Sequence, residues 1–304
     1  MVVRTQHRPR PQPGLIDIAG PARAAYATNR RMSLAYRGPL FKVRRASDNA
    51  EQDIYPNPIT GWCSVTQLVA FCAGTNGFLK TAYDLTGNGR HVTQATTTKQ
   101  PKVYDSATGT ILNGRNVCMR FDGVDDKLEY LTDSLGFSGD HSLTYGILLK
   151  LLDLSVSHVL VAIGSTNKFY PMYFGSSQAG NSSNTTVLAT KWRGSATNQT
   201  NEQIYVPNTS AGNLHFNVIQ HGVGELDSAL VWRQNGASIA ASDTDTHAFP
   251  SIDSAGFAIG GFPTVASTSV PLKADVASFV AFPSKLAGVG LTNLEAQLSY
   301  LKAA

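Results

Sequence analysis

From Gly77 onward the sequence is a succession of short β-rich segments, and this pattern constrains the fold more than any other feature. The segments are 4 to 12 residues long and are bounded by Gly, Asn, Ser or Pro, which are typical of turns. Strands that follow one another without helices between them bury their apolar faces as a sandwich or a barrel. We therefore predict a mainly β fold from segments such as SLTYGILLKLLD, SHVLVAIGS, LHFNVIQHG and ADVASFVAF.

The length and composition predict one β domain over residues 20–304. The chain has 304 residues, of which 42% are hydrophobic and 15% charged, and no apolar run is long enough to span a membrane. The first residues, MVVRTQHRPRPQPG, have no apolar core of a signal peptide. The three cysteines are an odd number without metal-ligand spacing, so we expect free thiols. We expect neither a membrane span nor a secretory route.

The first nineteen residues predict an extended basic arm. They contain Arg4, Arg8 and Arg10, and the prolines between them favour an extended chain. Residues 1–45 hold ten Lys or Arg and one acid, a balance of +9, which leaves −5 for the rest of a chain whose total is +4. We interpret the arm as a segment that docks onto a neighbouring subunit; a tail without a role stays open. Nucleic-acid binding is disfavoured because the arm has no aromatic side chain to stack on bases.

Three stretches predict helices within a helical region of about 21–75 and at the C-terminus. The alanine-rich residues 21–34 begin with Pro21, which suits a first helical turn. SVTQLVAFCAG combines a capping box of Ser64 and Gln67 with a stop at Gly74. A helix over about 292–302 starts at a capping box of Thr292 and Glu295 and presents a leucine stripe, Leu291, Leu294, Leu298 and Leu301.

Three stretches carry a resemblance to a known family. They read YRGPLFKVRRASDNAEQDI, FCAGTNGFLKTAYDLTGNGRHVTQATTTKQPKVYD and LNGRNVCMRFDGVDDKLEY, within residues 36–130. They resemble the catalytic domain of the α-L-arabinofuranosidase B family of glycoside hydrolases and relatives of that domain in bacteriophage structural proteins. The resemblance implies a concanavalin A-like (LamG-like) jelly roll, two antiparallel sheets packed face to face, in agreement with the strand pattern.

The same resemblance implies that the catalytic carboxylates are missing. The family's nucleophilic Glu follows a Tyr-Phe-Gly similar to residues 173–175, yet residues 154–201 contain no acid. The family's second carboxylate follows a Gly-Gly similar to residues 260–261, and the next residue in this chain is Phe262. A disulfide of the enzymes is also lost, because Gly77 stands opposite Cys72. Since a glycosidase of this type needs two carboxylates, we predict that the chain is not an enzyme.

Two Asp-Gly stretches are interpreted as structural turns. In YDLTGNGRH, Asp84 can accept backbone N–H groups, and Gly87 and Gly89 can take positive φ. In FDGVDDKL, Asp122 and Gly123 fit a hairpin turn better than a calcium loop, because the spacing is not that of an EF-hand. The histidines at 215 and 221 have no third ligand in the pattern. We predict no metal and no cofactor.

The polar stretch 175–213 is the predicted surface site. Aromatic faces beside amides and hydroxyls suit sugars, so the candidate glycan-binding residues are Tyr173, Trp192, Arg193 and Tyr205. A plain solvated loop pair or a subunit interface explains the same composition.

Taken together, these patterns lead us to predict a non-enzymatic bacteriophage virion protein, a capsid decoration or tail fibre component. Its arm would dock onto other virion proteins or copies of itself, and its body would contact host polysaccharide. A lectin-like carbohydrate-binding module is the first alternative and an arabinofuranosidase with displaced carboxylates the second.

Overall fold

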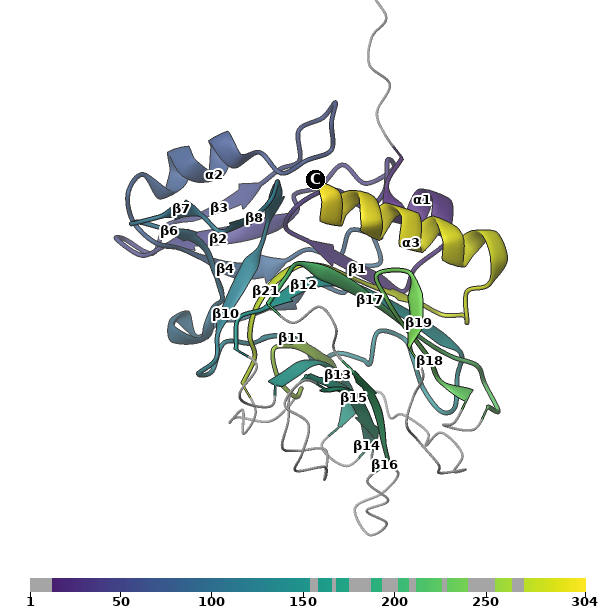
Figure 1. Ribbon diagram of the computed structural model, residues 1–304. Helices are drawn as coiled ribbons and strands as arrows, with labels where there is room; N and C mark the ends of the chain where they lie inside the picture. Colours follow the sequence, from purple (N-terminus) through teal and green to yellow (C-terminus); the bar gives the residue numbers. More distant parts are fainter. Residues whose placement is uncertain are drawn as a thin grey trace, which may run out of the picture.

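The computed structural model describes residues 13–153, 158–165, 168–174, 187–192, 202–207, 212–225, 229–239, 255–263 and 271–304. Within them the protein is a mainly β sandwich of antiparallel strands, which confirms the predicted fold class. The two layers face each other, and three helices lie outside them (Figure 1). No helix in these ranges has both the length and the apolar character that a membrane crossing requires.

The first layer is built on the longest strand, β21. One edge of β21 pairs with β12, and from β12 the layer continues through β17 and β18 to β19. The other edge of β21 pairs with β1 along one part of its length and with β10 along another. From β10 the layer continues through β6 to β4, β2 and β3, and β7 pairs with β6. The strands are β1 Ala24–Ala27, β2 Phe41–Arg45, β3 Glu51–Ile54, β4 Gly77–Ala82, β6 Lys102–Asp105, β7 Gly109–Thr110, β10 Met119–Asp122, β12 Leu143–Leu151, β17 His215–His221, β18 Val231–Gln234, β19 Ala237–Ile239 and β21 Lys273–Phe282.

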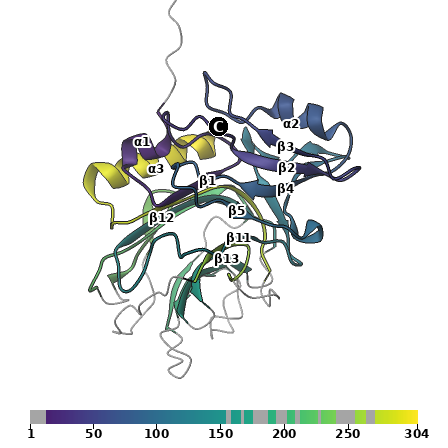
Figure 2. The ribbon, with the colours of Figure 1, turned by 180° about the vertical axis from the view of Figure 1, so that it is seen from behind.

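The second layer runs in the order β16, β15, β14, β13, β20, β11 and β5. Strand β5 also pairs with β4, so it joins the two layers; Figure 2 shows it between β4 and β11. The strands are β5 Val92–Thr93, β11 Leu128–Tyr130, β13 His158–Ser165, β14 Lys168–Phe174, β15 Val187–Trp192, β16 Glu202–Pro207 and β20 Phe257–Ile259; a separate hairpin pairs β8 Leu112–Asn113 with β9 Asn116–Val117.

Aromatic rings fill the space between the layers. Tyr26 of β1 stacks on Phe257 of β20 at 5.7 Å between ring centroids, and Phe257 lies 5.2 Å from Phe279 of β21. All three side chains are fully buried. Ring pairs of this kind contribute beyond their area, so this stack holds the two sheets in register where β20 enters the second layer.

Helices cover the outer face of the first layer. Helix α3, Gly288–Ala303, buries Leu294, Leu298 and Leu301. Gly146 of β12 makes room for it, because a Cβ there would lie 3.2 Å from Leu294 and 3.3 Å from Leu298. The helix begins earlier than predicted: Ala287 is the N-cap, and Glu295 binds Arg233 instead of closing a capping box.

Two further sequence predictions about the N-terminal region are wrong. Residues 21–34 are not helical, because Ala24–Ala27 form β1, which pairs with β21 and is completely buried; tertiary packing overrides the helix propensity of the alanines. The arm does not extend to residue 19, because α1, Leu15–Ala19, packs on α3 with Leu15 and Ala19 buried.

Helix α2, Val65–Cys72, begins at the predicted N-cap, but the Gln67 side chain bonds Tyr55 and Asp53 instead of closing the capping box, and the helix ends at Ala73, one residue before the predicted Gly74. Ser64 Oγ accepts a hydrogen bond from the Gln67 N–H, and Ala73 takes the left-handed conformation that ends the helix. The thiols of Cys63, Cys72 and Cys118 are free and buried. Cys72 Sγ lies 2.5 Å from the point where a Cβ on Gly77 would stand, so the missing side chain at Gly77 accommodates this thiol. A short 3-10 helix spans Thr97–Lys99.

Candidate active site

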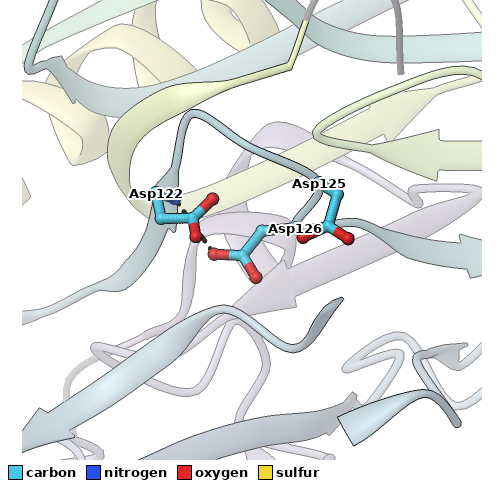
Figure 3. Close-up of side chains that lie close together, drawn as sticks. All are labelled: Asp122, Asp125 and Asp126. Atoms are coloured by element: carbon cyan, nitrogen blue, oxygen red, sulfur yellow. Dashed lines mark hydrogen bonds between the residues drawn. The ribbon is translucent and has the colours of Figure 1, made fainter. Parts of the chain in front are cut away.

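The turn between β10 and β11 gathers three carboxyl groups, those of Asp122, Asp125 and Asp126 (Figure 3). One oxygen of each lies within 4.8 Å of the others. The Asp122 side chain accepts a hydrogen bond from the Val124 N–H at 2.7 Å, which fixes the start of the turn. Gly123 has φ +84°, and a Cβ there would lie 2.9 Å from the Cβ of Lys273. The sequence therefore needs glycine at this position for both conformation and space.

Asp126 is the buried member of this group, with 5% of its surface exposed. Its Oδ2 accepts a hydrogen bond from the Asp122 N–H at 3.0 Å. Burial, followed by the neighbouring charge of Asp122, raises the pKa of Asp126 to about 7, against the effect of this hydrogen bond. Asp122 itself is exposed. The turn thus places a carboxyl that holds its proton near neutrality beside one that faces water, an arrangement that suits acid–base chemistry.

The segment after β20 lies directly against Asp126. Gly260 has φ +88°, and a Cβ there would lie 2.8 Å from the Asp126 carbonyl oxygen and 2.6 Å from the Phe121 ring. Lys127 Nζ donates a hydrogen bond to the Phe262 carbonyl at 3.2 Å. The Gly-Gly-Phe, where the resemblance implies a lost carboxylate, therefore packs against the backbone of Asp126 and the Phe121 ring.

The carboxyl cluster offers oxygen atoms of the kind that Ca²⁺ binds. Cations of the protein already lie next to it: Lys99 Nζ is 3.9 Å from Asp125, and Lys127 Nζ is 2.7 Å from Glu129 in the adjoining strand. A protonated Asp126 is also a poor ligand. The chemistry of this donor set therefore favours proton transfer over a metal centre.

Asp84 has a different environment. It is fully buried, and its carboxylate accepts hydrogen bonds from the N–H groups of Ala25, Thr86 and Arg90 at 3.1 to 3.2 Å and from the Thr86 hydroxyl at 2.7 Å. Gly87 and Gly89 have φ of +86° and +77°. This carboxylate joins the turn to β1, and its oxygens are occupied by that task.

The two histidines of β17 are bonded to backbone carbonyls. His215 Nδ1 lies 2.8 Å from the Asn213 oxygen, and the ring nitrogens of His221 lie 3.4 Å and 3.3 Å from the oxygens of His141 and Glu225. Each ring is thereby oriented by the chain around it.

The predicted glycan-binding residues fall on strands whose backbone alone is described. The register aligns Tyr173 of β14, Ala189 of β15 and Tyr205 of β16 in one cross-strand row. Trp192 pairs with Glu202, the first acid after the interval without carboxylates. Arg193 and the arm residues Arg4, Arg8 and Arg10 lie outside the described residues, so docking through them stays a prediction.

Comparisons with known proteins agree with this architecture. A family model described as "Alpha-L-arabinofuranosidase B, catalytic" matches residues 17–122. The alpha-L-arabinofuranosidase B of Penicillium canescens is 41% identical over 75 residues, which are 25% of this chain and 16% of that protein. The enzyme of Emericella nidulans is 36% identical over 104 residues, 31% of this chain and 20% of that protein. The aligned part thus spans about a sixth to a fifth of these relatives.

A solved arabinofuranosidase complexed with arabinofuranosyl-alpha-1,2-xylobiose superposes with a TM-score of 0.69 at 14% identity, over 92% of this chain and 63% of that chain. A GH54 arabinofuranosidase soaked with a cyclic sulfate inhibitor gives 0.68 over the same shares. The chain is a β-sandwich that resembles this catalytic domain.

These matches overturn two predictions, the virion protein and the absence of enzymatic activity. The matched family model is a catalytic domain, and the curated relatives and solved structures above are arabinofuranosidases, not bacteriophage proteins. The prediction of no activity rested on two aligned positions, near residues 173–175 and 260–261, and not on the matched region 17–122. FDGVDDKL forms the predicted turn, and that turn also brings three carboxyl groups together.

Proposed function

We propose that the protein is a glycoside hydrolase of the α-L-arabinofuranosidase type. The observation that carries the proposal is the match of residues 17–122 to the catalytic-domain model, which ends at Asp122 in the acidic turn. The fold supports it, because the sandwich superposes over 92% of the chain on solved arabinofuranosidases. The substrate class follows by analogy with those relatives.

Asp126 is the general acid in this proposal. A catalytic acid must keep its proton near the working pH, and the raised pKa of Asp126, about 7, meets this requirement. Asp122 supplies the second carboxylate. The two groups have oxygens within 4.8 Å, close to the roughly 5 Å separation of retaining glycosidases and shorter than that of inverting ones.

The chemistry follows from these two roles. The Asp122 carboxylate attacks the anomeric carbon while Asp126 donates its proton to the departing glycosidic oxygen, which leaves as an alcohol. An ester between Asp122 and the sugar results. The Asp126 carboxylate then takes a proton from water, whose oxygen displaces Asp122 and releases arabinose with retained configuration. Activity should fall above pH 7, as Asp126 loses the proton that it must donate.

Hydrolysis of 4-nitrophenyl α-L-arabinofuranoside tests the proposal. Wild-type protein should release 4-nitrophenol, and Asp126→Asn should lower kcat/KM on arabinofuranosyl-xylobiose, whose departing oxygen needs a proton, by about 10²- to 10⁴-fold. Asp125→Asn is the matched control, because this neighbouring acid has no assigned role and should retain activity. The absence of turnover by the wild type, or equal losses in the two variants, would contradict the assignment.

A further inference from the structure

A second cluster of charge lies away from the acidic turn, where the C-terminal end of α3 approaches the loop before α2 (Figure 1); the rings of Trp62 and Tyr300 lie 6.3 Å apart there. Arg30 and Arg31 are adjacent in sequence, and each is only 3% exposed. Gly61 lies against both side chains, because a Cβ there would stand 3.1 Å from Arg31 Nε and 3.4 Å from Arg30 Nε. Two guanidinium groups are therefore held together beneath this loop.

Aromatic rings and a third arginine form the outer side of the cluster. The Arg30 guanidinium lies 5.9 Å from the Trp62 ring centroid and 5.8 Å from that of Tyr300. Arg115, which is exposed, lies 5.1 Å from the Trp62 centroid. The rings stabilise these cations, yet they bring no negative charge. The cluster thus reaches the surface at Arg115 and Tyr300.

Arg31 has an unsatisfied hydrogen-bonding edge. Its Nε and Nη2 atoms are both buried and have no hydrogen-bond partner among the residues that the structure describes. These two nitrogens form the side of a guanidinium that binds both oxygens of a carboxylate or phosphate at once. Buried polar groups are nearly always paired, and an unpaired buried charge is costly. This edge therefore has the geometry and the need for an oxyanion.

The acid near this cluster is already engaged. Asp17 acts electrostatically on Arg31, but its oxygens accept hydrogen bonds from the Gly14 and Leu34 N–H groups at 2.7 and 2.8 Å and from the Ser33 hydroxyl at 2.7 Å. Burial, and then the charge of Arg37, lower the pKa of Arg31. The surroundings of Arg31 thus add positive charge, which an external anion would neutralise.

We propose that Arg31, with Arg30 and Arg115 beside it, binds a small oxyanion through its Nε–Nη2 edge. The ligand is a planar or tetrahedral oxyanion with two oxygens that can accept hydrogen bonds. Inorganic phosphate and the carboxylate of a uronic acid both have this chemistry. This site is separate from the acidic turn and does not rest on the proposed function.

Thermal unfolding in the presence of defined anions tests the site. Wild-type protein is measured in sodium chloride, sodium phosphate, D-galacturonate and neutral D-galactose, with ionic strength kept constant. Phosphate or galacturonate should raise Tm by about 2 °C or more over chloride, because a ligand that binds the folded state stabilises it. A response to phosphate alone assigns a phosphate site, and a response to galacturonate alone assigns a carboxylate site.

Two variants and a control connect any shift to Arg31. Arg31→Met removes the unpaired charge, so its Tm in chloride should equal or exceed that of the wild type, and it should gain nothing from either anion. Arg31→Lys keeps the charge but loses the bidentate edge, and its anion response should fall by more than half. Arg45→Met, which removes an exposed arginine bound to Asp48, should respond as the wild type does.

Two results would overturn the proposal. Equal anion shifts in wild type and Arg31→Met would place binding elsewhere, and no shift in the wild type would mean that water alone serves this edge. If Arg31→Met fails to fold, isothermal titration of the wild type and of Arg31→Lys with phosphate and galacturonate gives the same decision, because only binding at Arg31 weakens in the Lys variant.

Discussion

Two aspartates, Asp84 and Asp126, lie in two different turns, and their surroundings differ: Asp84 links its turn to β1, whereas Asp126 is the general acid that we propose. Both are buried and both stand beside a glycine of positive φ. Asp84 accepts four hydrogen bonds and links its turn to β1. Asp126 accepts one among the described residues and has two acidic neighbours. Hydrogen-bond donors surround the carboxyl of Asp84, whereas burial and the charge of Asp122 raise the pKa of Asp126.

The largest expected effect on the free energy of unfolding comes from a substitution that breaks the Asp84 turn. Asp84→Ala leaves three N–H groups without their acceptor, so we expect a loss of about 4 kcal/mol or more in the free energy of unfolding. Asp126→Ala removes one such acceptor and also a buried acid, so its loss should be under about 2 kcal/mol. Urea denaturation at pH 7 measures both. Similar losses in the two variants would remove the distinction between the turns.

A second effect is the pH dependence of stability at Asp126. Its folded-state pKa of about 7 lies above the unfolded value of about 3.9. The folded state therefore holds the proton more tightly, and this contribution is fully present below pH 4 and lost as pH rises through 7. The expected loss is at most about 4 kcal/mol. Asp126→Asn should flatten the curve between pH 4 and 7, whereas an unchanged slope would show that Asp126 titrates normally.

Two glycine substitutions separate backbone strain from crowding. Gly87 and Gly260 have nearly equal φ, +86° and +88°. A Cβ at Gly87 meets nothing within 4 Å, whereas at Gly260 it meets Phe121 and the Asp126 backbone. Gly87→Ala should cost about 1 kcal/mol, and Gly260→Ala about 3 kcal/mol. Equal melting temperatures for these two variants would show that β20 does not press on the Asp126 turn.

Sequence patterns predicted the architecture better than the site. Alternating segments and turn residues gave the sandwich, and Ser64 located α2, because these signals are local. A helix was predicted at Ala24–Ala27 because the local sequence is rich in alanine. The strand that forms there is buried against β21, whose residues are about 250 positions away in the chain. The contact between Asp126 and Gly260 is equally non-local, so the sequence could show three acids in a turn but not what lies beside them.

The most direct test of the central claim compares substrates with different leaving groups. A general acid matters most when the departing oxygen is a poor leaving group, and 4-nitrophenol leaves well without a proton. Asp126→Asn should therefore lower kcat/KM at least about tenfold more on arabinofuranosyl-xylobiose than on 4-nitrophenyl α-L-arabinofuranoside. Equal losses on the two substrates, or an unchanged rate on arabinofuranosyl-xylobiose, would contradict the role of Asp126 as the acid.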